Sequence, residues 1–282
     1  MRTITFKGLF LTVLFMLLGS LTIQAADGGL ITNQITIKLD KAGTLPDSIS
    51  ESQKYLITNL KIVGKVNGTD WKLIRNMAGS DFYGRETGGK LSILDLSDAR
   101  IVKGGSAYYS DYEISQCTSN DKLGDYAFYG CSRLTNLNIP SSVTTIGYYA
   151  FKDCSRLTSL VIPSSVTSIG DAAFYGCSGL TSIYVYPEKL PELESGIFSG
   201  CNAQNCTVYV PKGTYDDYKA SEFGYFENIV EFDATDIDKV TTFTDAKEVS
   251  RYSVNGQRLS APAKGLNIVK YSDGSVKKVA VQ

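Results

Sequence analysis

The sequence predicts a solenoid of short repeats, each made of one strand and a return segment, followed by a small all-β module. For the solenoid, Cys131, Cys154 and Cys177 stand 23 residues apart, and nearly the same words recur around each of them. A repeat of roughly 20 to 50 residues is too small to bury its own apolar face, so its copies must stack. For the module, Asn255-Gly256 lies between two β-like segments and is the strongest short hairpin signal.

The first 26 residues have the pattern of a secretory signal. Arg2 and Lys7 precede an apolar run from Leu9 to Leu18 and a cleavage site of small residues. The run is too short to span a membrane, although a retained N-terminal anchor stays an alternative. No cysteine follows the cleavage site, which argues against a lipoprotein anchor. We expect a mature chain that begins near Asp27 and is exported, to the cell surface and outer membrane or to the extracellular space.

Residues 27–90 are expected to form an N-terminal cap and irregular leading repeats. Residues 55–62 have a strand pattern, and residues 70–77 have helical spacing. A repeat stack needs a polar-faced cap at its start. A cap strand is indicated by alternating aliphatic residues, which are Ile31, Ile35, Ile37 and Leu39.

The repeats are expected over residues 91–232. In the clearest copy Leu160 and Ile162 point inward from a short strand, and Pro163 ends it because proline has no amide to donate. Gly170 supplies a bend, and the return is either helical or extended. The opposite wall of this repeat is formed by Val166, Ile169, Ala173 and Phe174.

Residues 102–124 interrupt the repeats with a segment rich in Tyr, Ser and Gly. We expect this insertion to be a surface loop. Its aromatic and sulfur-bearing residues are Tyr108, Tyr109, Tyr112 and Cys117.

Residues 212–232 are expected to close the stack with a short helix, N-capped by Thr214, and a last strand over 226–232. Residues 233–239 are polar and read as a linker. The module then covers residues 240–282. Its strands flank Asn255-Gly256 and a second turn at 272–274.

Six cysteines in an exported chain would ordinarily indicate disulfides. In a stacked solenoid, however, equivalent side chains point the same way, so neighbouring thiols do not face each other. We therefore expect a ladder of buried, free thiols at Cys131, Cys154, Cys177 and Cys201. The pair best suited to a disulfide is Cys201 with Cys206, at the irregular last repeat.

The composition excludes several functional classes. The chain has no histidine, so Ser-His-Asp and Cys-His catalysis and histidine-based zinc sites are excluded. A net charge of -1 and a pI of about 5.7 argue against nucleic acid as a partner. Two pairs of acids could serve a glycosidase, Asp216-Asp217 and Glu192 with Glu194, but they read better as surface charge. We expect no enzyme, cofactor or metal.

The repeat words resemble the BspA-type leucine-rich repeats of exported bacterial surface proteins over residues 125–232. They share the Ile-Pro strand end, Ser-Val-Thr-x-Ile-Gly, Ala-Phe, and a Cys followed three residues later by Leu. The tail, with Tyr252–Arg258, Gly265–Ile268 and Lys277–Val279, is similar to the C-terminal β-module that some bacteria use as a type IX secretion sorting signal. The resemblance implies surface exposure, adhesion to host or bacterial macromolecules such as matrix proteins, and no catalytic residues.

Residues that alternate with the buried ones should form outward ladders across the strands. These ladders are neutral and become aromatic toward the C-terminal end. We expect them to bind a host or bacterial surface protein or glycan, because tyrosine is a favoured interface residue. The alternatives are that the tyrosines only cover strand edges, or that the protein is an envelope spacer without a ligand. The candidate face comprises Asn136, Asn138, Ser159, Val161, Ser182, Tyr184, Tyr186, Thr207 and Tyr209.

Overall fold

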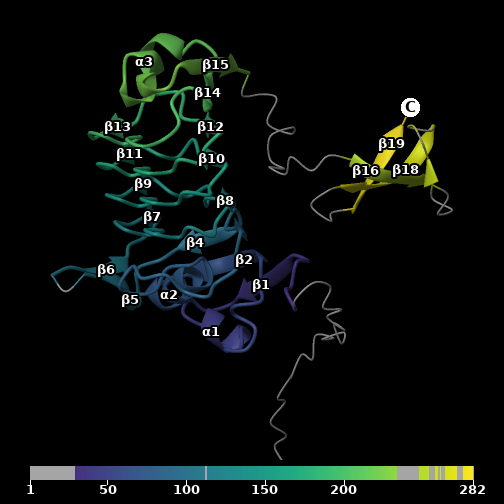
Figure 1. Ribbon diagram of the computed structural model, residues 1–282, viewed down its shortest axis with the longest axis horizontal. Helices are drawn as coiled ribbons and strands as arrows, with labels where there is room; N and C mark the ends of the chain where they lie inside the picture. The colour runs from purple at the N-terminus through teal and green to yellow at the C-terminus, as the bar shows by residue number, and fades with distance from the viewer. Residues whose placement is uncertain are drawn as a thin grey trace, which may run out of the picture.

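The computed structural model describes residues 29–111, 113–233, 248–253, 258–259, 261, 264–271 and 276–281. The expected signal segment, Tyr112, nearly all of the linker and the two turns of the C-terminal module lie outside the described residues. The order of elements is a cap, a stack of repeats, a second cap and a β-module, as Figure 1 shows.

The solenoid is built around a large parallel sheet to which each repeat contributes one strand. The hydrogen-bonded order is β1-β2-β3-β8-β10-β12-β14-β15, and β4 also pairs with β2. The strands are β1 (Ile35–Leu39), β2 (Asn59–Val66), β3 (Ile93–Asp95), β4 (Ala99–Ile101), β8 (Asn136–Asn138), β10 (Ser159–Ile162), β12 (Ser182–Val185), β14 (Thr207–Pro211) and β15 (Asn228–Phe232). This open parallel stack confirms the predicted leucine-rich repeat solenoid.

A second, narrower parallel sheet forms the return side. It consists of two-residue strands in the order β13-β11-β9-β7, and the rest of each return is made of consecutive turns without a helix. Backbone bonds link each return to the next, with Phe128 N donating to Ala150 O at 2.6 Å and Phe151 N to Ala173 O at 2.7 Å. The strands are β7 (Lys122–Leu123), β9 (Thr145–Ile146), β11 (Ser168–Ile169) and β13 (Glu192–Leu193).

Each return is turned at backbone positions with positive φ. Tyr126, Tyr149 and Ala172 occupy equivalent places in three repeats with φ of 58, 51 and 50°. Non-glycine residues rarely adopt this conformation, so the stacked neighbours must hold it in place. In the next repeat Gly196 takes the position with φ of 63° and without a steric penalty.

An aromatic spine runs through the core between the two sheets. Neighbouring rings of Phe128, Phe151, Phe174 and Phe198 are stacked, with centroids 5.3, 5.1 and 5.6 Å apart. All four side chains are buried. Because each repeat presents the same ring to its neighbour, the spine makes one continuous core out of units that could not fold alone.

The ladder cysteines confirm the prediction that they are buried and free. Cys131, Cys154, Cys177 and Cys201 are buried, and three of them donate to the phenylalanine carbonyl of the preceding repeat, as Cys154 Sγ does to Phe128 O at 3.2 Å. Burial raises the pKa of Cys131 to about 11 and that of Cys201 to about 12. The prediction that Cys201 and Cys206 are the pair best suited to a disulfide was wrong, because both thiols are free.

A helix holds the N-terminal cap in place, because its side chains donate hydrogen bonds to backbone carbonyls of the first regular repeat. Helix α2 (Gly68–Met77) lies where helical spacing predicted it. Trp71 Nε1 donates to Ala127 O at 2.9 Å, and Arg75, fully buried, donates to Tyr126 O at 2.6 Å. Ahead of α2 stands the short helix α1 (Leu45–Ser48).

The insertion is not the surface loop that the sequence predicted. It forms an antiparallel hairpin of β5 (Gly104–Ser110) and β6 (Ser115–Thr118), and β5 packs on α2. Tyr108 and Tyr109 are buried, and Tyr108 Oη donates to Asp125 O at 2.7 Å. The prediction failed because a Tyr- and Gly-rich composition signals a loop, whereas these tyrosines cover the helix. Cys117 is exposed, as expected.

The C-terminal cap packs apolar rings on the last repeat. It comprises β15, helix α3 (Tyr215–Lys219) and the 3₁₀ helix η1 (Glu222–Tyr225). Phe198 contacts Phe223 and Phe226, with centroids 5.0 and 4.9 Å away. Thr214 stands at the N-cap of α3 as predicted, but its hydroxyl donates to Pro211 O and does not cap the helix.

The C-terminal module is an antiparallel sheet in the order β17-β16-β18-β19. Its strands fall on the predicted segments on either side of both turns. They are β16 (Glu248–Ser253), β17 (Arg258–Leu259), β18 (Gly265–Tyr271) and β19 (Val276–Val281).

Candidate functional site

The outward ladders of the large sheet lie in the predicted register. Asn136 pairs with Ser159, Ser159 with Ser182, and Ser182 with Thr207. In the second ladder Val161 pairs with Tyr184, and Tyr184 with Tyr209. All nine predicted residues are partly exposed, including Asn138 and Tyr186. The structure therefore brings the whole candidate face together on one side of the solenoid.

The C-terminal end of this face carries an aromatic patch. The rings of Tyr184 and Tyr209 are stacked, with centroids 4.4 Å apart and planes at 8°. Beside them Tyr186 meets Phe232 edge to face at 5.2 Å. Val230 pairs with Tyr209 and is 47% exposed. We call these five residues the aromatic patch.

Val230 and Phe232 are members of the patch that the sequence did not reveal. They lie on β15, where Val230 pairs with Tyr209 and Phe232 with Pro211, each 21 residues further along the chain. The last repeat is thus shorter than the 23-residue period, and a search at that period misses them. A last strand was predicted over 226–232, but only its register against β14 places these two side chains beside the tyrosines.

The two ends of the strand face differ in charge. At the N-terminal end Lys61 Nζ lies 2.7 Å from Asp98 and 3.2 Å from Asp95, so the charges are paired. At the other end the patch is uncharged, and burial together with the neighbouring Tyr184 raises the pKa of Tyr186. Tyr186 therefore keeps its hydroxyl proton at neutral pH and can donate a hydrogen bond to a partner.

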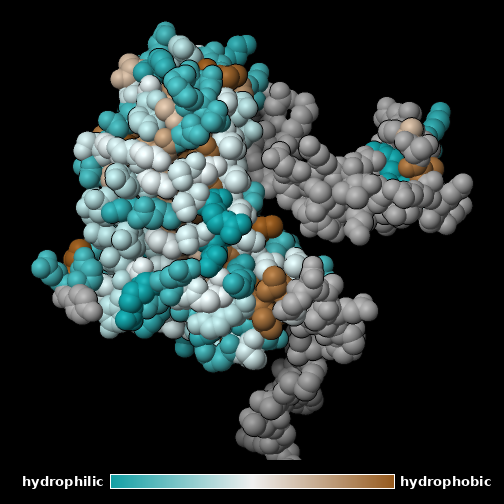
Figure 2. All heavy atoms as spheres, in the orientation of Figure 1, coloured by the Kyte–Doolittle hydropathy of each residue, from teal (hydrophilic) through white to brown (hydrophobic). Residues whose placement is uncertain are grey.

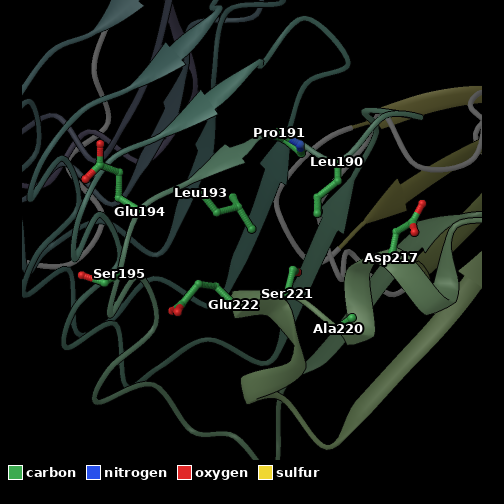
Figure 3. Close-up of a pocket in the computed structure, with 9 residues that line it drawn as sticks. All are labelled: Leu190, Pro191, Leu193, Glu194, Ser195, Asp217, Ala220, Ser221 and Glu222. Carbon is green, nitrogen blue, oxygen red and sulfur yellow. The ribbon is translucent and has the colours of Figure 1, made fainter.

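A hollow on the return side lies against the C-terminal cap. Its volume is about 720 Å³, and Figure 3 shows Leu190 and Leu193 between the return strand and the two short helices. Acidic side chains come from both sides of it, with Glu194 on the return and with Asp217 and Glu222 on α3 and η1. No set of metal-ligating side chains gathers among the described residues, here or elsewhere.

The acidic pairs considered for glycoside cleavage are solvent-facing. Glu192, Glu194, Asp216 and Asp217 are all exposed, on β13, the segment that follows it and α3. The general acid of a glycosidase sits in a site that excludes water, whereas these four carboxylates are open to solvent. They carry surface charge.

The surface of the solenoid is polar and mixed. Figure 2 shows a face on which hydrophilic and intermediate residues dominate, with brown restricted to small patches. Within the described residues, no helix has the length and apolar character needed to cross a membrane.

Three comparisons with known proteins bear on this architecture. A solved leucine-rich repeat protein from Bacteroides ovatus ATCC 8483 is 25% identical, and the match covers 71% of this chain and 42% of that one with a TM-score of 0.38. The chain thus spans less than half the length of that relative. No curated protein matches. The family model described as "BspA type Leucine rich repeat region" matches residues 104–249 in six copies, just over half of the sequence. With its 23-residue period and stacked parallel strands, this chain belongs to the BspA-type leucine-rich repeat family.

Proposed function

We propose that this protein is an exported, non-enzymatic binding protein that adheres to a protein or glycan through the strand face of its solenoid. The family points in general to binding at a surface. The observation that carries the proposal is the aromatic patch, because Tyr184, Tyr209, Tyr186, Phe232 and Val230 are contiguous at the end of a face that is otherwise small, neutral and polar.

The patch has the chemistry of an interface centre. Tyrosine and phenylalanine offer large contact area at low cost in conformational entropy, and tyrosine adds a hydrogen-bonding tip. Ser182 and Thr207, on the same two strands as the stacked tyrosines, give this centre a polar rim on one side. An apolar centre with a polar rim is the usual anatomy of a protein interface.

The secretory signal and the tail give this proposal a location. Residues 1–26 direct export, and the module at 240–282 acts as a sorting domain that leads the protein to the outer surface. The module forms an antiparallel sheet of its own, separate from the parallel sheets of the repeats.

A second candidate is an envelope spacer without a ligand. It is favoured by the ring stacking itself, since Tyr184 and Tyr209 cover part of each other and so stabilise the sheet without any partner. The spacer function requires the stack to be rigid but does not require the patch to be exposed.

Binding arrays separate the two candidates. The purified protein is applied to arrays of matrix proteins and glycans together with a Tyr184→Ala/Tyr209→Ala variant. The matched control is Asn136→Ala/Ser159→Ala, at the other end of the same face. Saturable binding that is lost in the tyrosine variant and kept in the control supports adhesion through the patch. Absence of binding to every array favours the spacer.

A further inference from the structure

A groove runs along the return side of the solenoid and ends against the C-terminal cap. One hollow, of about 470 Å³, lies over β9, β11 and β13, and the hollow of about 720 Å³ follows it between β13, α3 and η1. Leu193 and Glu194 line both hollows, so the two adjoin at these residues. The groove lies on the return sheet and shares no lining residue with the aromatic patch of the strand sheet.

Two partly exposed leucines, Leu190 and Leu193, give the groove an apolar strip near the cap, whereas Ile146 and Ile169 are fully buried beneath it. Glycines let the returns stack closely, because a side chain would collide with the preceding repeat. At Gly147, for example, a Cβ would collide with Asp125.

At the last repeat a glutamate takes the position that glycine holds in the two preceding repeats. Gly147 and Gly170 are followed, 24 residues on, by Glu194, and Glu194 N donates to Ile169 O where Gly170 N donates to Ile146 O one repeat earlier. The groove therefore gains one more charged side chain, that of Glu194, where it reaches the cap. Figure 3 shows this end, with Leu193 beside Glu194 and with Glu222 across from it.

The walls carry acidic charge that the protein does not neutralise. None of the six carboxylates that line the groove forms an ion pair with a lysine or arginine within the part of the chain that the structure describes. Lys219, the basic residue on α3, donates instead to Phe226 O at 3.2 Å. Two of the acids accept internal hydrogen bonds, Asp125 from Tyr148 N and Asp171 from Ser195 Oγ. The acids along the groove are Asp125, Asp171, Glu192, Glu194, Asp217 and Glu222.

We infer that this groove binds an extended, basic peptide segment of another protein. Charge complementarity selects lysine and arginine, and the exposed parts of Leu190 and Leu193 accommodate their aliphatic stems. Stacked repeats lie about 4.8 Å apart, so carboxylates of alternate repeats, such as Asp125 and Asp171, are about 9.6 Å apart along the stack. In an extended peptide of the polyproline II type, side chains three positions apart share a face and lie about 9.3 Å apart, which matches this spacing.

The first test is fluorescence anisotropy of the purified full chain with a short labelled peptide that has arginine at every third position. The comparison peptides carry glutamine or glutamate at the arginine positions. Saturable binding of the arginine peptide is expected, about tenfold weaker binding of the glutamine peptide and none of the glutamate peptide. Binding should weaken steeply between about 0.05 M and about 0.5 M salt, because exposed charges are screened.

The second test uses variants at the cap end of the groove. Glu194→Gln/Glu222→Gln should weaken binding of the arginine peptide about tenfold. Ala220→Arg should do the same by a different route, since it places a competing cation at an exposed residue of the groove lining. The matched control is Glu188→Gln/Glu227→Gln, two exposed acids that do not line the groove. Melting curves check that all variants are folded.

Equal affinity for the arginine and glutamine peptides, or unchanged affinity in both groove variants, would overturn the inference. So would a tenfold gain in affinity for Lys277→Gln/Lys278→Gln, because it would identify the chain's own basic tail as the occupant. The Tyr184→Ala/Tyr209→Ala variant should bind the peptide normally. Its behaviour on the arrays and its behaviour toward the peptide are therefore separate results.

Discussion

The two ends of the solenoid are closed by different chemistry. At the N-terminal end Trp71 and Arg75 donate hydrogen bonds to carbonyls of the first regular return, whereas at the C-terminal end Phe223 and Phe226 pack rings against Phe198. The difference follows from the backbone bonds in the turns of each return, where amides such as Phe128 N and Phe151 N donate toward the C-terminal neighbour. The first return is left with carbonyls that need donors, so its cap has to be polar and specific.

The largest expected effect is in the spine that connects the two ends. Phe151→Ala should destabilise the protein by about 3–5 kcal/mol, because the ring is fully buried between Phe128 and Phe174 and leaves a cavity. Thermal unfolding measures this, and Phe174→Ala should behave alike. Melting curves that match the unmodified protein would show that the spine does not carry the stack.

The comparison of the caps is sharpened by one substitution at each end. Trp71→Phe removes the donor to Ala127 O, and it should cost about 2–3 kcal/mol for the lost partner and the lost volume. Phe226→Leu keeps an apolar contact and should cost less than about 1.5 kcal/mol. Denaturant unfolding of both variants gives the two free energies. Equal costs would mean that the polar and apolar caps are energetically alike.

The buried thiols predict a loss of stability at alkaline pH. Burial raises the pKa of Cys131 to about 11 and those of Cys201 and Cys206 to about 12, so the folded state keeps protons that the unfolded state releases. The unfolded chain then binds fewer protons above its ordinary thiol pKa, and stability should fall as pH rises from about 9 toward 12.

Unfolding midpoints across this pH range check the thiol prediction, with Cys131→Ala as the variant that should flatten the curve. Under native conditions a thiol reagent should modify Cys117 and spare the four ladder cysteines, because only Cys117 is exposed. Rapid modification of all six thiols in the folded protein would contradict this.

The smallest expected effect is at the charged end of the strand face. Lys61→Met breaks contacts with Asp95 and Asp98, but the lysine is partly exposed, and such pairs contribute about 0–1 kcal/mol. The change should disappear at high salt, because screening already weakens the pair. A larger loss, insensitive to salt, would indicate that Lys61 supports the leading repeats by packing.

The regular repeats could be predicted from the sequence because the same 23-residue period governs the buried residues and the exposed residues that alternate with them. Leu160, Ile183 and their equivalents fixed the buried side, and the alternate residues, including Tyr184 and Tyr209, followed in register. The caps could be predicted only in part. Helical spacing located α2, but nothing local to Arg75 indicates that its donors serve carbonyls some 50 residues further along the chain.

The insertion and the groove could not be predicted from local sequence patterns, for related reasons. Tyr108 and Tyr109 belong to a composition typical of loops, and only the contact with α2 buries them. The groove joins Glu194 to Glu222, residues on a return and on a cap helix that no periodicity connects. Sequence patterns indicate which face a residue occupies, whereas the meeting of separate segments depends on tertiary packing.

The Phe128–Phe198 spine gives the protein an adjustable length. Among the described aromatic residues, each inner ring of the spine stacks on the ring before it and the ring after it, and the rings of the caps meet its terminal members. Duplicating the 23 residues from Cys131 to Asp153 in the gene would therefore add one layer without changing either cap. Each duplication would move the two ends apart by about 4.8 Å, so the reach of the molecule can change by gene duplication in fixed steps while its ends stay the same.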